Sequence, residues 1–226
     1  MEPFHFRSLK TLGAVTTLLL AGNAGLAALG LLISAWVESG AFEASVDDAT
    51  MDSYLAAAGL IGVLAIVIFV GTVVSFCMLV HRAATNLRVV GRTGLQYTPG
   101  WAVGWFFIPF ANLVKPFHAM KEIVLASDPD TKKSEYGSAW MTNPLPAIVN
   151  VWWGFWVTRM IVDRALSRVE SFGLEIASVV VEFIAVTAAI LLVQTIVRRQ
   201  EALGGEGRTV RIAREVGHVA ESGEQR

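Results

Sequence analysis

The sequence has few charged residues and almost no cysteine. Only 16% of its 226 residues are charged, whereas 54% are hydrophobic and the mean hydropathy is +0.55. These values are far from those of an average soluble protein and predict an integral membrane protein. Cys77, the single cysteine, lies in an apolar run, so we expect an isolated buried thiol rather than a reactive or metal-binding one.

The sequence also lacks the short motifs that carry common chemistry. It contains no HExxH, CxxC or CxxCH, no G-x-S-x-G, no glycine-rich phosphate loop and no convincing pair of catalytic carboxylates. An enzymatic activity is therefore unsupported, and we predict neither a metal site nor a cofactor. The expected partners are the lipid bilayer and other membrane subunits or a second copy of the chain, with no nucleic acid among them.

Four apolar runs are predicted to span a membrane, which takes about 20 helical residues. They cover approximately residues 11–37, 54–80, 145–162 and 176–197. The first run is longer than the apolar part of a signal peptide, so we interpret it as an uncleaved helix. Residues 38–52 contain acids but no Lys or Arg, whereas residues 82–92 contain three Arg and no acid. Arg198 and Arg199 directly follow the last run. Together with this asymmetry, they predict that both termini lie in the cytoplasm.

A fifth apolar region, residues 99–125, does not fit a simple span. Its uninterrupted part, residues 101–114, would cover only about 21 Å as a helix. Pro109 and Pro116 each remove a backbone donor and disfavour helix before them. With both termini on one side, this region must also return to the side from which it came. We expect a re-entrant hairpin that turns at residues 109–112, or an interfacial helix pair.

The predicted fold is therefore an all-α membrane protein with four transmembrane helices and a proline-broken re-entrant or interfacial segment. Residues 1–199 would form a single membrane domain. Residues 200–226 are polar and rich in glycine, which predicts a flexible cytoplasmic tail. A short helix over residues 209–219 is the regular element that this tail could contain.

Two ionisable residues lie inside predicted spans, where unpaired charges are costly. Arg159 and Glu182 are nearly equidistant from the predicted turn near residues 171–173. Antiparallel packing would bring them to similar depth, so we predict a structural ion pair. A proton or ion pathway is the alternative interpretation of the same two residues.

The polar and aromatic residues around the broken segment are further candidates. A polar site there would use Asn86, Asn112, Lys115, His118 and Glu122. We expect an aromatic cluster to screen the interrupted backbone from lipid, with members Trp101, Trp105, Trp152, Trp153 and Trp156.

The three stretches "HRAATNL", "TPGWAVGWFFIPFANLVKPFHAMKEI" and "NVWWGFW" resemble the bacterial multipass membrane family called domain of unknown function 4328. The resemblance covers roughly residues 75–200. It is carried by Arg82, Asn86, Pro99, Trp101, Trp105, Pro109, Asn112, Pro116, Glu122, Trp152 and Trp153. The resemblance implies the membrane architecture and, together with the predicted topology, a location in the bacterial inner membrane. It implies no established activity.

Three functions remain compatible with these features. A non-catalytic scaffold or accessory subunit of a membrane complex agrees best with the lack of reactive groups. A small-solute or ion transporter or channel would use the broken segment to line a cavity. A haem- or quinone-binding redox protein would need ligands such as His81 and His118 near one interface.

Overall fold

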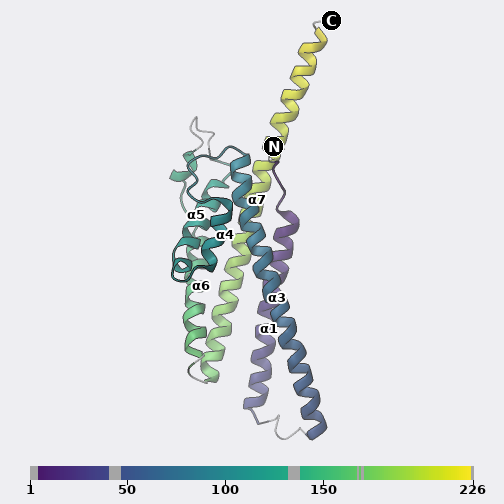
Figure 1. Cartoon of the computed structure of the whole chain (residues 1–226), viewed down its shortest axis with the longest axis vertical. Coiled ribbons are helices and arrows are strands. Elements are labelled where there is room, and N and C mark those ends of the chain that lie inside the picture. Colours follow the sequence, from purple (N-terminus) through teal and green to yellow (C-terminus); the bar gives the residue numbers. More distant parts are fainter. Residues whose placement is uncertain (1–4, 41–46, 132–137, 167, 169–170, 225–226) are drawn as a thin grey trace. The chain divides into compact units, whose positions relative to one another are not determined.

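The computed structural model describes residues 5–40, 47–131, 138–166, 168 and 171–224, and all regular structure in these ranges is helical. This confirms the all-α class. The elements, labelled in Figure 1 where room allows, are α1 (Lys10–Glu38), α3 (Asp48–Val89), α4 (Pro99–Gly104), η1 (Trp105–Phe107), η2 (Ala111–Leu113), α5 (Lys115–Ala126), η3 (Ala139–Thr142), α6 (Ala147–Leu166) and α7 (Phe172–Glu224).

Three of the described helices are long and apolar enough to cross a membrane. They are α1, the Thr50–Val89 part of α3, and the Phe172–Gly205 part of α7, which indicates a membrane protein. The prediction of four such helices was wrong by this criterion, because α6 is not among them. Although α6 has 20 residues, Arg159, Asp163 and Arg164 lie in its last two turns and lower its hydropathy.

The chain divides into two compact units, and the single membrane domain expected over residues 1–199 stays a prediction. The first unit contains residues 1–13, 78–145 and 194–226, and the second contains residues 14–77 and 146–193. The long helices α1, α3 and α7 each contribute residues to both units. Each unit is described separately below.

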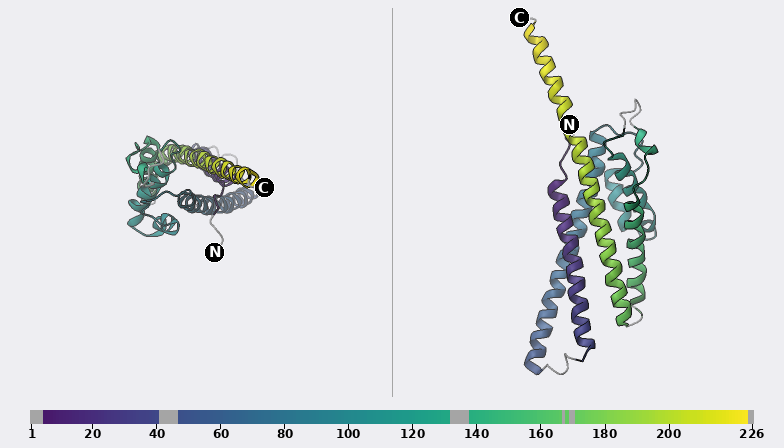
Figure 2. Two further views of the ribbon diagram at one scale, coloured as in Figure 1. Left: turned by 90° about the horizontal axis from the view of Figure 1, so that it is seen from above. Right: turned by 180° about the vertical axis from the view of Figure 1, so that it is seen from behind.

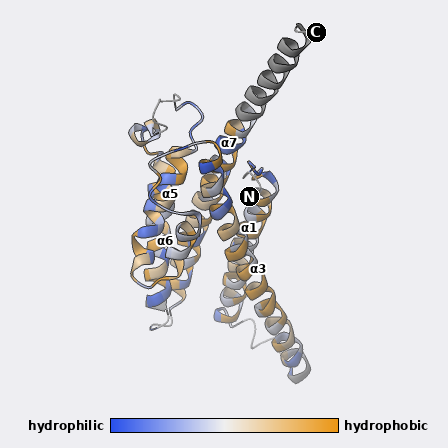
Figure 3. Cartoon of the chain, turned by 45° about the horizontal axis from the view of Figure 1, so that its top comes forward, coloured by the Kyte–Doolittle hydropathy of each residue, from blue (hydrophilic) through white to orange (hydrophobic). Residues whose placement is uncertain are grey.

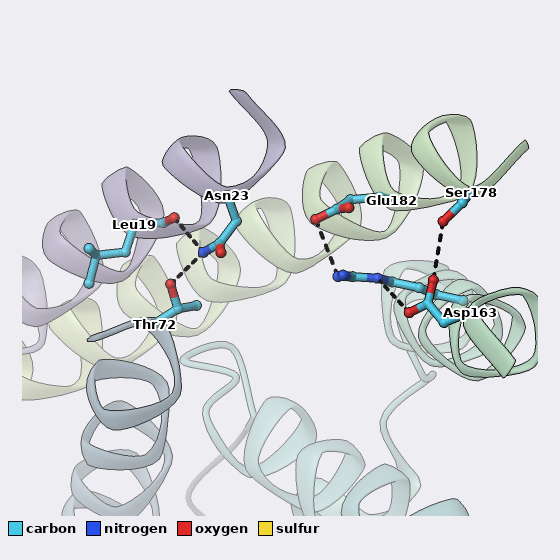
Figure 4. A network of polar contacts seen from close by, with 7 residues as sticks. Leu19, Asn23, Thr72, Asp163, Ser178 and Glu182 are labelled. Atoms are coloured by element: carbon cyan, nitrogen blue, oxygen red, sulfur yellow. Dashed lines mark hydrogen bonds and ion pairs between the residues drawn. The ribbon is translucent and has the colours of Figure 1, made fainter. Parts of the chain in front are cut away.

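In the second unit, α1 and α3 pack through small and polar residues. A Cβ atom at Gly22 would lie 3.5 Å from Ile68, and one at Gly71 would lie 3.5 Å from Leu19. Both distances are those of ordinary van der Waals contact, so the two glycines lie at the interface between α1 and α3, where small residues are common in membrane helices. Asn23 donates a 2.7 Å hydrogen bond to the Thr72 hydroxyl in the same interface (Figure 4).

The remaining surface of α1 and α3 in the second unit is largely apolar and exposed. Leu18 on α1 and Leu60 on α3 are each 73% exposed, and hydrophobic residues line much of both helices in Figure 3. An exposed apolar surface of this extent is unusual for a soluble monomer. It is what a helix surrounded by lipid presents.

The first unit has a conventional buried core around α5. Helix α5 is amphipathic: Ala119, Met120, Ile123 and Val124 are buried, whereas Lys115 and His118 are exposed. The other core side chains of this unit come from the N-terminal segment, α3, η3 and α7, and they include Leu9, Leu79, Val80, Ala83, Leu87, Trp140 and Ile196.

Helix α7 continues into the tail that we expected to be irregular. It runs without interruption to Glu224, and its helical ribbon is continuous in Figure 2. Ala, Arg and Glu, which recur beyond residue 205, have high helix propensity, and this outweighs the cost of the glycines. The short helix considered over residues 209–219 lies within this longer one. The flexibility expected of the tail stays a prediction.

Candidate functional site

Two side-chain amides are buried together in the first unit. Asn86 of α3 is 2% exposed and Gln200 of α7 is fully buried. The Asn86 amide nitrogen donates to Gln200 Oε1 over 3.0 Å and to the Arg7 carbonyl over 2.8 Å, and Asn86 Oδ1 accepts from the Arg7 N–H over 3.0 Å. Gln200 donates to the Ala83 carbonyl and to the Ser127 hydroxyl, each over 3.0 Å.

Each of the two amides thus uses both of its donor hydrogens on a specific acceptor. The bonds connect four segments that are distant in sequence: the N-terminal segment, α3, the end of α5 and α7. A buried polar network of this kind specifies one arrangement of its segments when every member is satisfied. We call the Asn86 and Gln200 side chains with these partners the amide network.

The N-terminal segment is held by charged residues as well. Glu201 Oε1 accepts from the Leu9 N–H and from the Ser8 hydroxyl, each over 2.7 Å. Arg82 donates to the Ser8 carbonyl over 3.2 Å. Because Leu9 directly precedes α1, Glu201 supplies from another helix the acceptor that a helix N-terminus requires.

Close packing of the N-terminal segment against α7 depends on a glycine. A Cβ atom at Gly204 would collide with the ring of Phe6, whereas one at Gly205 would have no neighbour within 4 Å. Gly204 therefore provides the space in which the Phe6 ring lies.

The C-terminal end of α5 is bound to α7 by an ion pair and a hydrogen bond. Arg199 Nη2 lies 3.2 Å from Asp128 Oδ2, and Arg199 Nη1 donates to the Val124 carbonyl over 2.8 Å. A cation here satisfies one of the last carbonyls of the helix and interacts favourably with the helix dipole. Arg92 binds the Asp128 carbonyl over 2.8 Å and fixes the loop before α4 at the same place.

Glu122 on α5 holds the loop that leads into α4. Its side chain is 7% exposed and accepts from the backbone N–H groups of Gln96 over 2.7 Å and Tyr97 over 3.2 Å. Burial raises the pKa of Glu122, while the two N–H donors and the positive charge of Arg88 partly oppose the increase. Burial, together with the negative charge of Glu122, also raises the pKa of Tyr97.

The predicted break of the aromatic segment lies where the prolines indicated it. Thr98 caps α4 by accepting from the Trp101 N–H, and Pro99 occupies the first turn. The helical chain stops after η1, and Phe110 has a φ of 63°. This backbone conformation is strained for a residue with a bulky side chain. The chain then forms η2 and re-enters a helix at Lys115.

The five polar candidates have separate partners in the structure. Within the described residues, no hydrogen bond or ion pair joins one of these side chains to another. Asn86 belongs to the amide network, and Glu122 binds the loop before α4. Lys115 lies 5.6 Å above the Trp105 ring, His118 contacts Phe117, and Asn112 is half-buried. The transport hypothesis assigned to them stays a prediction.

The aromatic candidates belong to both units. In the first unit the ring centroids of Trp101 and Trp105 are 4.8 Å apart. In the second unit Trp153 lies 5.5 Å from Trp152 and stacks on Trp156 at 4.9 Å. Trp152 is buried, and its ring also lies 6.4 Å from that of Phe76 on α3.

The ionisable candidates of the second unit lie on two antiparallel helices, α6 and α7. Arg159 Nη1 is 3.3 Å from Glu182 Oε1, and Arg159 Nε is 3.4 Å from Asp163 Oδ2. Asp163 in turn accepts from the Ser178 hydroxyl over 3.1 Å (Figure 4). The Glu182 side chain is 10% exposed and that of Arg159 is 38% exposed. One cation therefore compensates two acids.

Sequence reasoning missed Gln200 and its neighbours Arg199 and Glu201. The run from Arg198 to Glu201 follows an apolar span, and we interpreted its charges only as a signal of topology. The sequence did offer one sign of a buried polar contact, which is the side-chain amide of Gln200 at the end of this span. Its partner Asn86 is 114 residues away, and no local pattern identifies such a pair.

The described part of the chain is all-helical, three of its helices are long and apolar enough to cross a membrane, and its first unit contains a buried network of polar side chains. The chain belongs to the family described as a domain of unknown function, DUF4328, whose model matches residues 43–202. No curated protein and no solved structure matches the chain.

Proposed function

We propose that the protein is a multipass protein of the bacterial inner membrane with a non-catalytic role, as a scaffold or accessory subunit of a membrane complex. The proposal rests on the bonding partners of the buried polar side chains. Asn86, Gln200, Glu122 and Glu182 are buried, and each of them binds another segment of the same chain. These side chains build structure rather than a site for a substrate.

The proposed topology places the first unit in the cytoplasm. This unit contains the N-terminal segment, the basic stretch from Arg82 to Arg92, and Arg198 and Arg199 after the last span. Basic residues beside spans favour the cytoplasmic side.

The scaffold role predicts that the protein does not exist as a lone chain in native membranes. Native mass spectrometry and single-molecule photobleaching after extraction in mild detergent should show a second copy or another subunit in each particle. Consistent isolation as a lone monomer would contradict the role.

A matched pair of variants locates the contact. Ala58 and Gly62 form a small-xxx-small pattern on α3, a common contact between membrane helices. A Cβ atom at Gly62 has no neighbour within 4 Å, and the same holds for Gly30 on α1. We expect Gly62→Leu to reduce the assembled fraction and Gly30→Leu to leave it unchanged, while both variants keep the thermal stability of the monomer.

A further inference from the structure

The broken segment exposes an apolar surface that nothing in the described chain covers. Phe110 is 86% exposed and Phe107 is 63% exposed, and Trp101 and Val114 are each about half exposed. All four lie between residues 101 and 114, a stretch too short to span a bilayer. We call these four side chains the aromatic tip.

The backbone at the aromatic tip is strained so that a ring points outward. Phe110 is the one non-glycine residue with positive φ in the described ranges, a conformation that costs of the order of 1–3 kcal/mol. Exposing the phenyl ring to water contributes no free energy that would offset this strain. The same conformation is favourable if the ring enters an apolar medium, because burying a phenyl group contributes free energy of similar size.

Basic side chains follow directly on α5. Lys115, His118 and Lys121 recur at intervals of three residues and so share one side of the helix. Lys115 and His118 are exposed, Lys121 is half-buried, and none of the three forms an ion pair with an acid in the described ranges. Lys115 lies over the Trp105 ring. A cation beside an aromatic ring is typical of the boundary between headgroups and acyl chains.

We propose that the aromatic tip and the basic face of α5 together bind the surface of an anionic phospholipid leaflet. The rings of the tip enter the boundary between headgroups and acyl chains, and Lys115 and Lys121 bind the phosphate groups. This inference rests on the membrane location within the proposed function. It makes the segment an interfacial anchor rather than a re-entrant hairpin.

The depth of the tip tests the proposal. In a Cys77→Ser background, Phe110→Cys carries an environment-sensitive fluorophore, and the protein is reconstituted in vesicles of phosphatidylcholine and phosphatidylglycerol. Asp130→Cys, on an exposed residue outside the helices, serves as the aqueous reference. Val67→Cys, exposed at the middle of the apolar part of α3, serves as the deep reference.

We expect lipids with a nitroxide near the headgroup to quench the label at position 110 at least twice as strongly as lipids with a nitroxide near the end of the acyl chain. Quenching like that at position 67 would show a re-entrant segment and overturn the proposal. Aqueous quenching like that at position 130 would also overturn it, as would protection from all quenchers, which would indicate a protein partner. A label at position 67 that no lipid quenches would instead refute the membrane location itself.

The choice of lipid tests the basic face. Lys115→Gln and Lys121→Gln should each reduce the preference for phosphatidylglycerol over phosphatidylcholine by about fivefold, which is the effect of one lysine near an anionic surface. Arg214→Gln neutralises a cation in the part of α7 beyond the last predicted span. It is the matched control and should change the lipid preference less than twofold. An unchanged preference in the Lys115→Gln and Lys121→Gln double variant would overturn the assignment of the phosphate contacts.

Discussion

Replacing Asn86 with alanine should both destabilise the protein and release its N-terminal segment. The substitution removes two hydrogen bonds to Arg7 and one to Gln200. At a net value of about 0.5–1.5 kcal/mol each, their loss amounts to roughly 2–4 kcal/mol. The fully buried Gln200 Oε1 would also lose its donor, and an unsatisfied buried acceptor adds to the cost.

The assay has a global and a local part. Thermal unfolding in detergent can be followed by the reaction of a thiol-specific dye with Cys77, the single cysteine of the chain. Hydrogen exchange measured by mass spectrometry reports on the amides of residues 7–9. We expect a lower unfolding midpoint and faster exchange in Asn86→Ala. Asn112→Ala is the matched control, because Asn112 is half-buried and lies outside the amide network, and it should change stability by about 0.5 kcal/mol or less.

A double-mutant cycle with Gln200→Ala measures the bond between the two amides. Because Asn86 and Gln200 share a hydrogen bond, the cost of the double variant should be smaller than the sum of the two single costs, by at least about 0.5 kcal/mol. Additive costs would refute the reasoning. Wild-type exchange at residues 7–9 in Asn86→Ala would refute it too.

Three further predictions follow from other contacts. Arg159→Gln should reduce thermal stability more than Glu182→Gln does, because the arginine compensates two acids; equal midpoints would contradict this. Gly204→Ala should accelerate exchange at residues 7–9 and Gly205→Ala should not, since only the first Cβ atom meets the docked segment. The raised pKa of Glu122 means that its folded form binds protons more tightly than its unfolded form does, so its contribution to stability should fall as pH rises from 4.5 through the raised pKa. Unfolding midpoints of wild type and Glu122→Gln across this window should therefore diverge as pH changes, and a constant difference would contradict the prediction.

The parts of the fold that are encoded locally could be predicted from the sequence. Long apolar runs identified α1, α3 and α7, since a span needs about 20 apolar residues whatever packs around it. Pro109 and Pro116 located the break, because proline acts on its own backbone and on the residue before it. The amide network could not be predicted, since its bonded members are 73 to 117 residues apart and become neighbours only through packing.

Helix α6 shows why counting apolar residues gave four spans. Its first turns, with Ala147, Ile148 and Val149, are apolar, but Asp163 and Arg164 lie just beyond the predicted end at residue 162. The window of the prediction therefore contained one charge, and the helix contains three. A span predicted from an apolar run ends where the charged residues begin. The backbone of α6 continues as a helix beyond that point because Arg, Ala and Leu favour helical structure.

The connections of the helices explain how a polar helix can accompany three apolar ones. The beginning of α1, the end of α3 and the end of the apolar part of α7 lie in one unit, and the N-terminal segment is bonded directly to α3 and α7. Helix α6 precedes α7 in the chain and lies antiparallel to it, so its charged side chains lie beside a helix that is apolar enough to cross a membrane. An unpaired charge in such a helix would cost about 2.5–3.5 kcal/mol. The contacts of Arg159 with Glu182 and Asp163 offset that cost, so α6 depends on α7 in a way that α1 and α3 do not. Replacing Arg159, Glu182 and Asp163 together by Met, Leu and Asn removes all three charges and should therefore preserve the pairing of α6 with α7 in thermal unfolding. Glu182→Leu alone leaves the cation of Arg159 with one acid fewer and should weaken this pairing.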